Sequence, residues 1–250
     1  MMTPAMRKLI VGNWKMNGSL ELVQAIATEL RSAGRDLHCD LVVCPPATLL
    51  FEISRALAGS QIDVGGQDCH EASKGAYTGD VSADMLREAG ASWVILGHSE
   101  RRSAHSETDA LVRRKAVTAE AAGLTPIICV GETEAERDSG RSHDTIDAQL
   151  RGSVPEDFSG VVAYEPIWAI GTNRSAHPQE IAETHAFIRS RLRGICRARG
   201  GRDTPPILYG GSVNASNARE ILATSNVDGV LVGGASLSPT DFAAIAREAG

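Results

Sequence analysis

The stretch "REAGASWVILG", residues 87–97, holds the end of a helix, a glycine and a short strand in immediate succession. Residues before Gly90 follow helical periodicity, whereas the run 92–96 is apolar on both of its faces. Strands of this kind are typical of a parallel sheet that is covered by helices. The same unit recurs as "AEAAGLTPIICVG" at residues 119–131, which indicates that the helix–strand pair is repeated along the chain.

The alternation of apolar runs and helical segments continues through the whole chain. The expected strands are 8–12, 40–44, 61–65, 92–96, 126–130, 160–164, 206–209 and 228–232. The expected helices are 19–33, 46–58, 82–89, 107–122, 134–151, 178–199, 216–224 and 239–249. Glycines mark several helix ends, namely Gly34, Gly59, Gly90, Gly123 and Gly200. Eight such units in 250 residues fit a (β/α)8 barrel better than a doubly wound sheet, although counting units leaves the second fold open.

Composition points to one domain and argues against several classes of partner. No linker or composition shift divides residues 1–250, so a single barrel domain is expected. The net charge of −6 comes from interspersed acidic and basic residues, which argues against nucleic-acid binding. No apolar window approaches a membrane span, so no membrane association is expected. The five cysteines lack C-x-x-C spacing and no secretory leader precedes them, which favours reduced thiols and a cytoplasmic location.

In a barrel of this kind, the residues that follow each strand line the mouth where chemistry takes place. Asn13 and Lys15 follow the first apolar run, His98 and Glu100 follow the fourth, and Glu165 follows the sixth. Each residue alone is more often a surface or structural group, but together they would bring an amide, an ammonium, an imidazole and a carboxylate to one place. Four other histidines, on loops or helices, are interpreted as structural: His105, His143, His177 and His185. No zinc-like spacing occurs, so no metal is expected.

Two glycine pairs, Gly210-Gly211 and Gly233-Gly234, follow the seventh and eighth runs. Glycine lets backbone N–H groups approach an anion, and phosphate sites at this place are recurrent in (β/α)8 barrels. A single pair would fit a tight turn equally well, but two pairs at adjacent strand ends favour phosphate. A carboxylate that removes a carbon-bound proton, with an imidazole and an ammonium that stabilise an enediolate, predicts proton transfer on a small phosphorylated carbonyl compound. No cofactor is needed for this reaction.

Five segments resemble the signature of the triosephosphate isomerase family and occur in the family's order. They are "GNWKMNG" (12–18), "GHSERR" (97–102), "AYEPIWAIGT" (163–172), "YGGSV" (209–213) and "LVGGASL" (231–237). "GGQDCH" (65–70) and "GAYTGDVSADML" (75–86) also resemble that family, so that the likeness covers residues 7–249. The resemblance implies a TIM barrel that interconverts D-glyceraldehyde 3-phosphate and dihydroxyacetone phosphate without a cofactor.

The resemblance also implies a role for each site residue. Glu165 would be the base that shuttles the proton, His98 the neutral electrophile, and Lys15, with Asn13 beside it, the electrostatic stabiliser. Glu100 would pair with Lys15, and Cys129 would lie beside the site. The substrate would be bound by Asn13, Lys15, Gly171, Ser212, Gly233 and Gly234.

Two further segments take a meaning from the family. A lid that excludes water would consist of Pro166, Ile167, Trp168, Ala169, Ile170, Gly171, Thr172, Asn173, Arg174, Ser175 and Ala176. Segment 67–81 is too long for an ordinary connection, and in the family the corresponding loop reaches a second subunit. Thr78 would then approach Asn13 and His98 of the partner subunit in a homodimer, whereas the alternative is a floppy surface loop.

Three departures from the family pattern leave the catalytic residues in place. Asp80 stands where Glu is usual, Asn173 replaces a glycine at the lid tip, and "RSAHSETD" (102–109) lacks a common aromatic-glycine step. Three other functions remain as alternatives: an isomerase of longer sugar phosphates, a phosphate-binding barrel with different chemistry, and an inactive barrel that only binds. An inactive barrel would be expected to have lost Glu165, His98 or Lys15.

Overall fold

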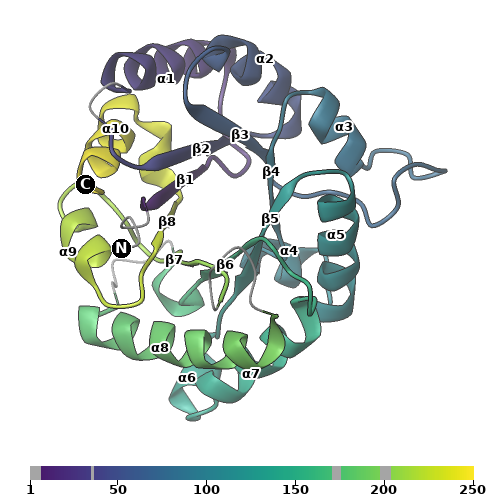
Figure 1. The fold of residues 1–250 in the computed structure, drawn as a ribbon, viewed down its shortest axis with the longest axis vertical. Coiled ribbons are helices and arrows are strands. Elements are labelled where there is room, and N and C mark those ends of the chain that lie inside the picture. Colours follow the sequence, from purple (N-terminus) through teal and green to yellow (C-terminus); the bar gives the residue numbers. More distant parts are fainter. Residues whose placement is uncertain (1–6, 35–36, 171–175, 198–203) are drawn as a thin grey trace, which may run out of the picture.

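The computed structural model describes residues 7–34, 37–170, 176–197 and 204–250. Eight parallel strands close into a barrel in chain order, and β8 pairs back to β1 (Figure 1). The strands are β1 Leu9–Asn13, β2 Asp40–Cys44, β3 Ile62–Gly66, β4 Trp93–Leu96, β5 Thr125–Val130, β6 Val161–Tyr164, β7 Ile207–Tyr209 and β8 Gly229–Val232. All the expected strand runs overlap these strands. The expected (β/α)8 TIM barrel is therefore confirmed, and the doubly wound alternative is wrong.

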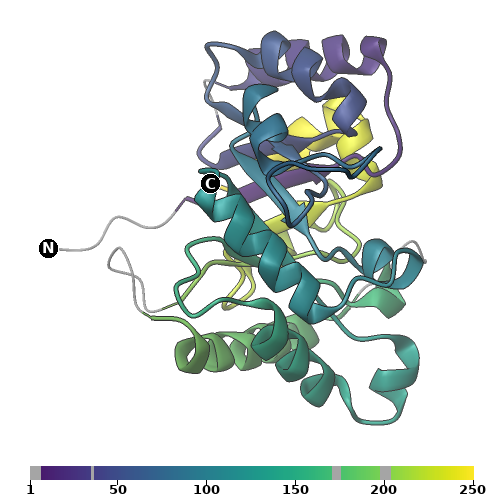
Figure 2. The same cartoon turned by 90° about the vertical axis from the view of Figure 1, so that its right-hand side faces the viewer.

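Helices surround the barrel on its outside (Figures 1 and 2). They are α1 Leu20–Ala33, α2 Ala47–Leu57, α3 Ala83–Glu88, α4 Ser99–Ala104, α5 Asp109–Ala121, α6 Glu134–Asp138, α7 Ser142–Ser153, α8 Pro178–Ile195, α9 Ala218–Ala223 and α10 Pro239–Arg247. Two short 3-10 segments follow strands β6 and β8, η1 Ile167–Ala169 and η2 Gly234–Leu237.

The helix boundaries follow local capping chemistry. The side chains of Ser19, Ser82 and Thr108 accept backbone hydrogen bonds at the starts of α1, α3 and α5. Gly59 and Gly90, with φ of 77° and 98°, follow α2 and α3 in the left-handed conformation that ends a helix. These caps fix where each helix begins relative to the strand before it.

Three details of the helix expectations are wrong. Segment 134–151 is not one helix but two, because Gly140 adopts φ 71° between α6 and α7. Helix α4 was not predicted, since "SERRSA" has no apolar periodicity. Helix α8 ends at Ile195 instead of 199, and Gly200 lies outside the described residues. Gly34 follows α1 with φ −60°, so its helix end does not depend on a left-handed residue.

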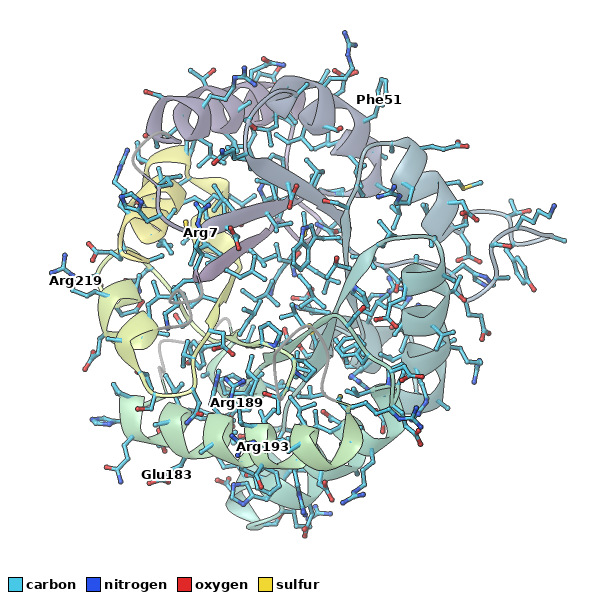
Figure 3. All side chains as sticks on the ribbon, viewed as in Figure 1. Arg7, Phe51, Glu183, Arg189, Arg193 and Arg219 are labelled. Atoms are coloured by element: carbon cyan, nitrogen blue, oxygen red, sulfur yellow. The ribbon has the colours of Figure 1, made fainter. Side chains whose placement is uncertain are left out.

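The core has two layers. Inside the barrel lie alternate strand residues, namely Leu9, Val11, Val42, Cys44, Ile95, Ile127, Cys129, Val161, Ala163, Leu208 and Leu231. The intervening strand residues, such as Ile10 and Val43, pack outward against the helices in a larger cluster. Figure 3 shows side chains filling the barrel interior, while Phe51 from α2 and Arg219 from α9 point away from it. The interior is thus a packed core that supports the barrel mouth from below.

Segment 67–81 extends from the end of β3 beyond the ring of helices (Figure 1). Figure 2 brings to the front the side of the barrel where α5 and this segment lie. Across the described ranges, we find no helix that is both long and apolar enough to cross a membrane.

Candidate active site

The polar residues expected at strand ends meet at the carboxyl-terminal mouth of the barrel. Asn13 ends β1, and Glu165 follows directly after β6, whereas His98 stands two residues beyond the end of β4. A hollow of about 450 Å³ is lined by Asn13, Lys15, His98, Glu165, Ser212, Gly233 and Gly234, among other residues. A volume of this order accommodates a small ligand.

Glu165 and His98 form a buried pair at the base of this hollow. Glu165 Oε1 lies 2.8 Å from His98 Nε2, and the backbone N–H of Ser99 donates to Glu165 Oε2 at 2.9 Å. The Glu165 side chain is 2% exposed. Burial raises the pKa of Glu165, but His98, the Ser99 N–H and Lys15 lower it by more, so that the pKa lies below its ordinary value. Glu165 is therefore an ionised carboxylate in this arrangement.

The imidazole of His98 is oriented by the start of α4. The backbone N–H of Glu100 donates to His98 Nδ1 at 3.3 Å, which assigns the ring proton to Nε2 and directs it at Glu165. Burial lowers the pKa of His98, while the carboxylates of Glu165 and Glu100 raise it by more. A second proton on Nδ1 would have to displace the Glu100 N–H. The ring can thus donate from Nε2 to an oxygen in the hollow.

Lys15 stands in a strained backbone conformation with φ 52°. Its N–H donates to Asn13 Oδ1 at 2.9 Å, and its Nζ lies 2.6 Å from Glu100 Oε1. The side-chain amide of Gln67 donates to the carbonyls of Lys15 and Cys44, both at 2.9 Å. The sequence reasoning gave Gln67 no role. Its position directly after β3 was the signal that could have identified it.

The two glycine pairs have different surroundings. A Cβ on Gly211 would lie 2.2 Å from Tyr209 Oη, and one on Gly210 would lie 3.1 Å from Glu165 Cγ. Close packing therefore explains this first pair without any ligand. Among the described residues, a Cβ on Gly233 would meet only Lys15 Cε at 3.6 Å, and one on Gly234 would meet none within 4 Å. The described residues therefore leave space beside the second pair, next to the lysine.

The part of the expected lid that the structure describes is hydrogen-bonded to Glu132. Trp168 Nε1 and the Tyr164 hydroxyl donate to Glu132 Oε1 at 2.9 and 3.1 Å, and the N–H of Ile167 donates to the Glu132 carbonyl at 3.2 Å. Glu132 is fully buried. It follows β5 in the sequence, but the sequence reasoning assigned it no function. The expected lid residues 171–175, including Gly171, lie outside the described residues, and Ala176 is buried.

Cys129 and Thr78 lie in contrasting environments. Cys129 is fully buried inside the barrel, and burial, with the Glu165 carboxylate beside it, raises the pKa of its thiol well above the ordinary value. Cys129 therefore packs inside the barrel with its thiol protonated. Thr78 is exposed in segment 67–81 and does not line the hollow of its own chain.

Comparison with known proteins places this site in a family. The family model described as triosephosphate isomerase matches residues 8–249. The triosephosphate isomerase of Granulibacter bethesdensis is 54% identical over 250 residues, which cover 97% of this chain and 99% of that protein. The triosephosphate isomerase of Afipia carboxidovorans is 53% identical over 245 residues, covering 96% and 97%.

A solved structure agrees with these sequence relatives. The crystal structure of triosephosphate isomerase from Bartonella henselae superimposes with a TM-score of 0.85 at 45% identity, and the match covers 96% of this chain and 98% of that chain. The family match extends from β1 to α10 and so includes every strand end that contributes to the hollow. The chain belongs to the triosephosphate isomerase family.

Proposed function

We propose that this protein interconverts D-glyceraldehyde 3-phosphate and dihydroxyacetone phosphate through an enediolate. The observation that carries the proposal is the buried contact of 2.8 Å between Glu165 and His98 at the barrel mouth. Lys15 Nζ adds a positive charge to the same hollow. A carboxylate, an N–H donor and an ammonium are the groups that proton abstraction next to a carbonyl requires.

Glu165 is the base that moves a proton between the two carbons. In the substrate-free site, hydrogen bonds from His98 and Ser99 lower its pKa, whereas burial raises it. When a substrate oxygen accepts the hydrogen bond from His98 Nε2–H in place of Glu165, Glu165 loses that hydrogen bond but remains buried. The pKa of Glu165 then rises, because burial is no longer offset by the His98 hydrogen bond. The carboxylate is therefore a stronger base when the substrate is bound.

His98 and Lys15 stabilise the negative oxygen that develops in the enediolate. The Nε2–H of His98 donates to this oxygen, while the Glu100 N–H keeps the ring in the required tautomer. Because Glu165 then no longer raises the pKa of His98, the ring acts as a neutral donor. Lys15 exchanges part of its contact with Glu100 for the substrate, and Asn13 fixes its backbone.

The phosphate binds at the far end of the hollow, to backbone N–H groups of Ser212, Gly233 and Gly234. The open space beside Gly233 and Gly234 supports this placement, as does the proximity of Lys15. The family's lid, residues 166–176, supplies Gly171 as a further donor in this proposal. No cofactor takes part, because every proton transfer has a donor and an acceptor among these side chains.

We also propose that the active form is a homodimer joined through segment 67–81. Large apolar side chains are exposed on this segment and near it: Met16 (94% exposed), Tyr77 (48%) and Met85 (56%). Burying such groups against a second chain is favourable. Thr78 then reaches the partner's Asn13 and the partner's His98. The five free cysteines fit a cytoplasmic protein.

The test is steady-state isomerisation of glyceraldehyde 3-phosphate by the purified protein, without added metal or nucleotide. The matched control is Glu165→Gln, which keeps the shape of the side chain but removes its basicity. We expect kcat of the variant to fall by roughly 10²–10⁴-fold, while KM changes much less. Wild-type turnover in Glu165→Gln would contradict the base assignment. If the wild-type protein forms a folded dimer but does not isomerise glyceraldehyde 3-phosphate, the substrate would instead be a longer ketose phosphate.

A further inference from the structure

Arg137 of α6 contacts three chain segments that meet beside the active site. Its guanidinium carbon lies 4.3 Å from the centre of the Trp168 ring. One guanidinium nitrogen lies 3.6 Å from Glu132 Oε1, and another pairs with Glu180 in the first turn of α8. One side chain therefore connects the segments that follow β5 and β6 with the start of α8.

The contact with Trp168 combines two directional interactions. The guanidinium carbon lies over the ring face, and Glu132, which Arg137 also contacts, accepts the hydrogen bond from Trp168 Nε1 at 2.9 Å. The ring is thus contacted both on its face and at its edge. Glu132 is a buried carboxylate, so the positive charge of Arg137 also lowers the cost of keeping it there.

The contact with Glu180 adds an anchor at the other end of the segment that follows η1. Glu180 accepts the N–H of His177 at 2.8 Å and thereby caps α8. Arg137 therefore connects η1, which begins two residues after Glu165, to the first turn of α8. Along the chain, only Pro166 and Ile167 separate Trp168 from Glu165.

We propose that Arg137 is a positioning residue for the isomerisation: it fixes the plane of the Trp168 ring and, through η1, the backbone that carries Glu165. The inference rests on the proposed function. Arginine is suited to this place because its planar guanidinium stacks on a ring while its nitrogens contact two carboxylates. A lysine ammonium is a point charge and cannot both stack on the ring and contact two carboxylates.

The first test compares kcat and KM of Arg137→Met, Arg137→Lys and wild type. We expect both variants to lower kcat about tenfold and to leave KM within about twofold, because the base is displaced whereas the phosphate site at Gly233 is not. Arg141→Met is the matched control: Arg141 contacts Ser139 in its own turn and should leave kcat unchanged. Wild-type kcat in Arg137→Met would overturn the proposal.

A double-mutant cycle with Trp168→Leu separates positioning from a general loss of stability. If Arg137 acts through Trp168, then Arg137→Met should lower kcat by less than about twofold in the Trp168→Leu background. Fully multiplicative effects would overturn the proposed path. Glu180→Gln provides a milder variant that keeps the stack, and we expect it to lower kcat about two- to threefold. Circular dichroism of each variant verifies the fold.

Tryptophan emission gives a readout that does not depend on catalysis. The chain has three tryptophans, and the difference between wild type and Trp168→Leu isolates the signal of Trp168. Arg137→Met should shift this signal to longer wavelength, because the ring loses the guanidinium that covers it. An unchanged Trp168 signal would overturn the positioning role. If the wild type failed to isomerise trioses while the shift occurred, the proposed function would be wrong and the contact right.

Discussion

At the scale of single residues, the site depends on groups that hold the reacting side chains. Lys15 keeps φ 52° because Asn13 and Gln67 hydrogen-bond its backbone from both sides. A non-glycine residue in this region is unfavourable by itself, so the surrounding bonds must hold it there. The Lys15 backbone is thus held by an amide from a different strand end, while Glu100 contacts its ammonium.

Gln67→Ala is expected to release the backbone of Lys15. The Lys15 carbonyl loses the Gln67 donor, while the Cys44 carbonyl keeps the Trp14 N–H at 3.1 Å, and kcat/KM should fall about tenfold because the proposed mechanism needs the ammonium held over the substrate. Steady-state kinetics measures this effect, and Gln61→Ala, at an exposed glutamine, serves as the control. Equal kcat/KM in Gln67→Ala and wild type would show that Lys15 needs no such support.

A buried histidine outside the site should make stability depend on pH. Burial lowers the pKa of His185 to about 4, and its Nδ1 lies 3.1 Å from the Asn226 carbonyl. In the unfolded chain its pKa is about 6.5. Between about pH 6.5 and 4 the unfolded state binds a proton that the folded state does not, so the free energy of unfolding falls as the pH drops through this window and is undiminished above it.

His185→Gln removes this titration while it keeps a donor for the Asn226 carbonyl. Between pH 6.5 and 4 the variant should lose less unfolding free energy than wild type, by up to roughly 3 kcal/mol for a pKa difference of this size. Urea unfolding at a series of pH values and one fixed protein concentration measures the difference. Parallel pH profiles of the two proteins would refute the prediction.

At the scale of elements, periodicity predicted every strand, because a buried parallel strand is apolar on both faces. Helix α4 was not predicted, because its six polar and small residues form no apolar stripe. Its start is instead capped by the His98 side chain, which accepts the Glu100 N–H. Strand ends likewise identified Glu165, His98 and Lys15. Glu132 also stands just beyond a strand end, β5, but its contacts with Tyr164 and Trp168 form only where the segments after β5 and β6 meet in space. Arg137 lies within α6 and follows no strand end, so its contact with Trp168 could not be found in this way.

Two glycines at helix positions should respond in opposite directions to the same substitution. Gly140 has φ 71° between α6 and α7, whereas Gly194 lies within α8, and at both positions an added Cβ would meet no atom of the described residues within 4 Å. Gly140→Ala should therefore destabilise by about 1 kcal/mol, and Gly194→Ala should stabilise by about 0.5–1 kcal/mol. Thermal unfolding compares the two, and a destabilising Gly194→Ala would contradict the helical assignment.

At the scale of the whole molecule, segment 67–81, with residues 73–80 exposed, is the feature that a lone barrel does not explain (Figure 1). Replacing this segment by a short turn should yield a monomer with little isomerase activity, because in the proposed homodimer Thr78 completes the partner's site. Size-exclusion chromatography with light scattering and steady-state kinetics measure the two properties together. A fully active monomer would contradict the proposed homodimer.

Tyr77→Asp, a single change at an exposed ring, should weaken the dimer without shortening the chain.

The pairing of β1 with β8 has a consequence for synthesis on the ribosome. The edge of β1 that receives β8 stays open until residues 229–232 have emerged. A nascent chain therefore carries unpaired backbone groups along Leu9–Gly12 for most of its translation, and such edges recruit other strands. Lys15 and Gly233, which border one hollow, come together only at this last step. Any chain released early would thus be a substrate for chaperones and proteases before it could become an enzyme.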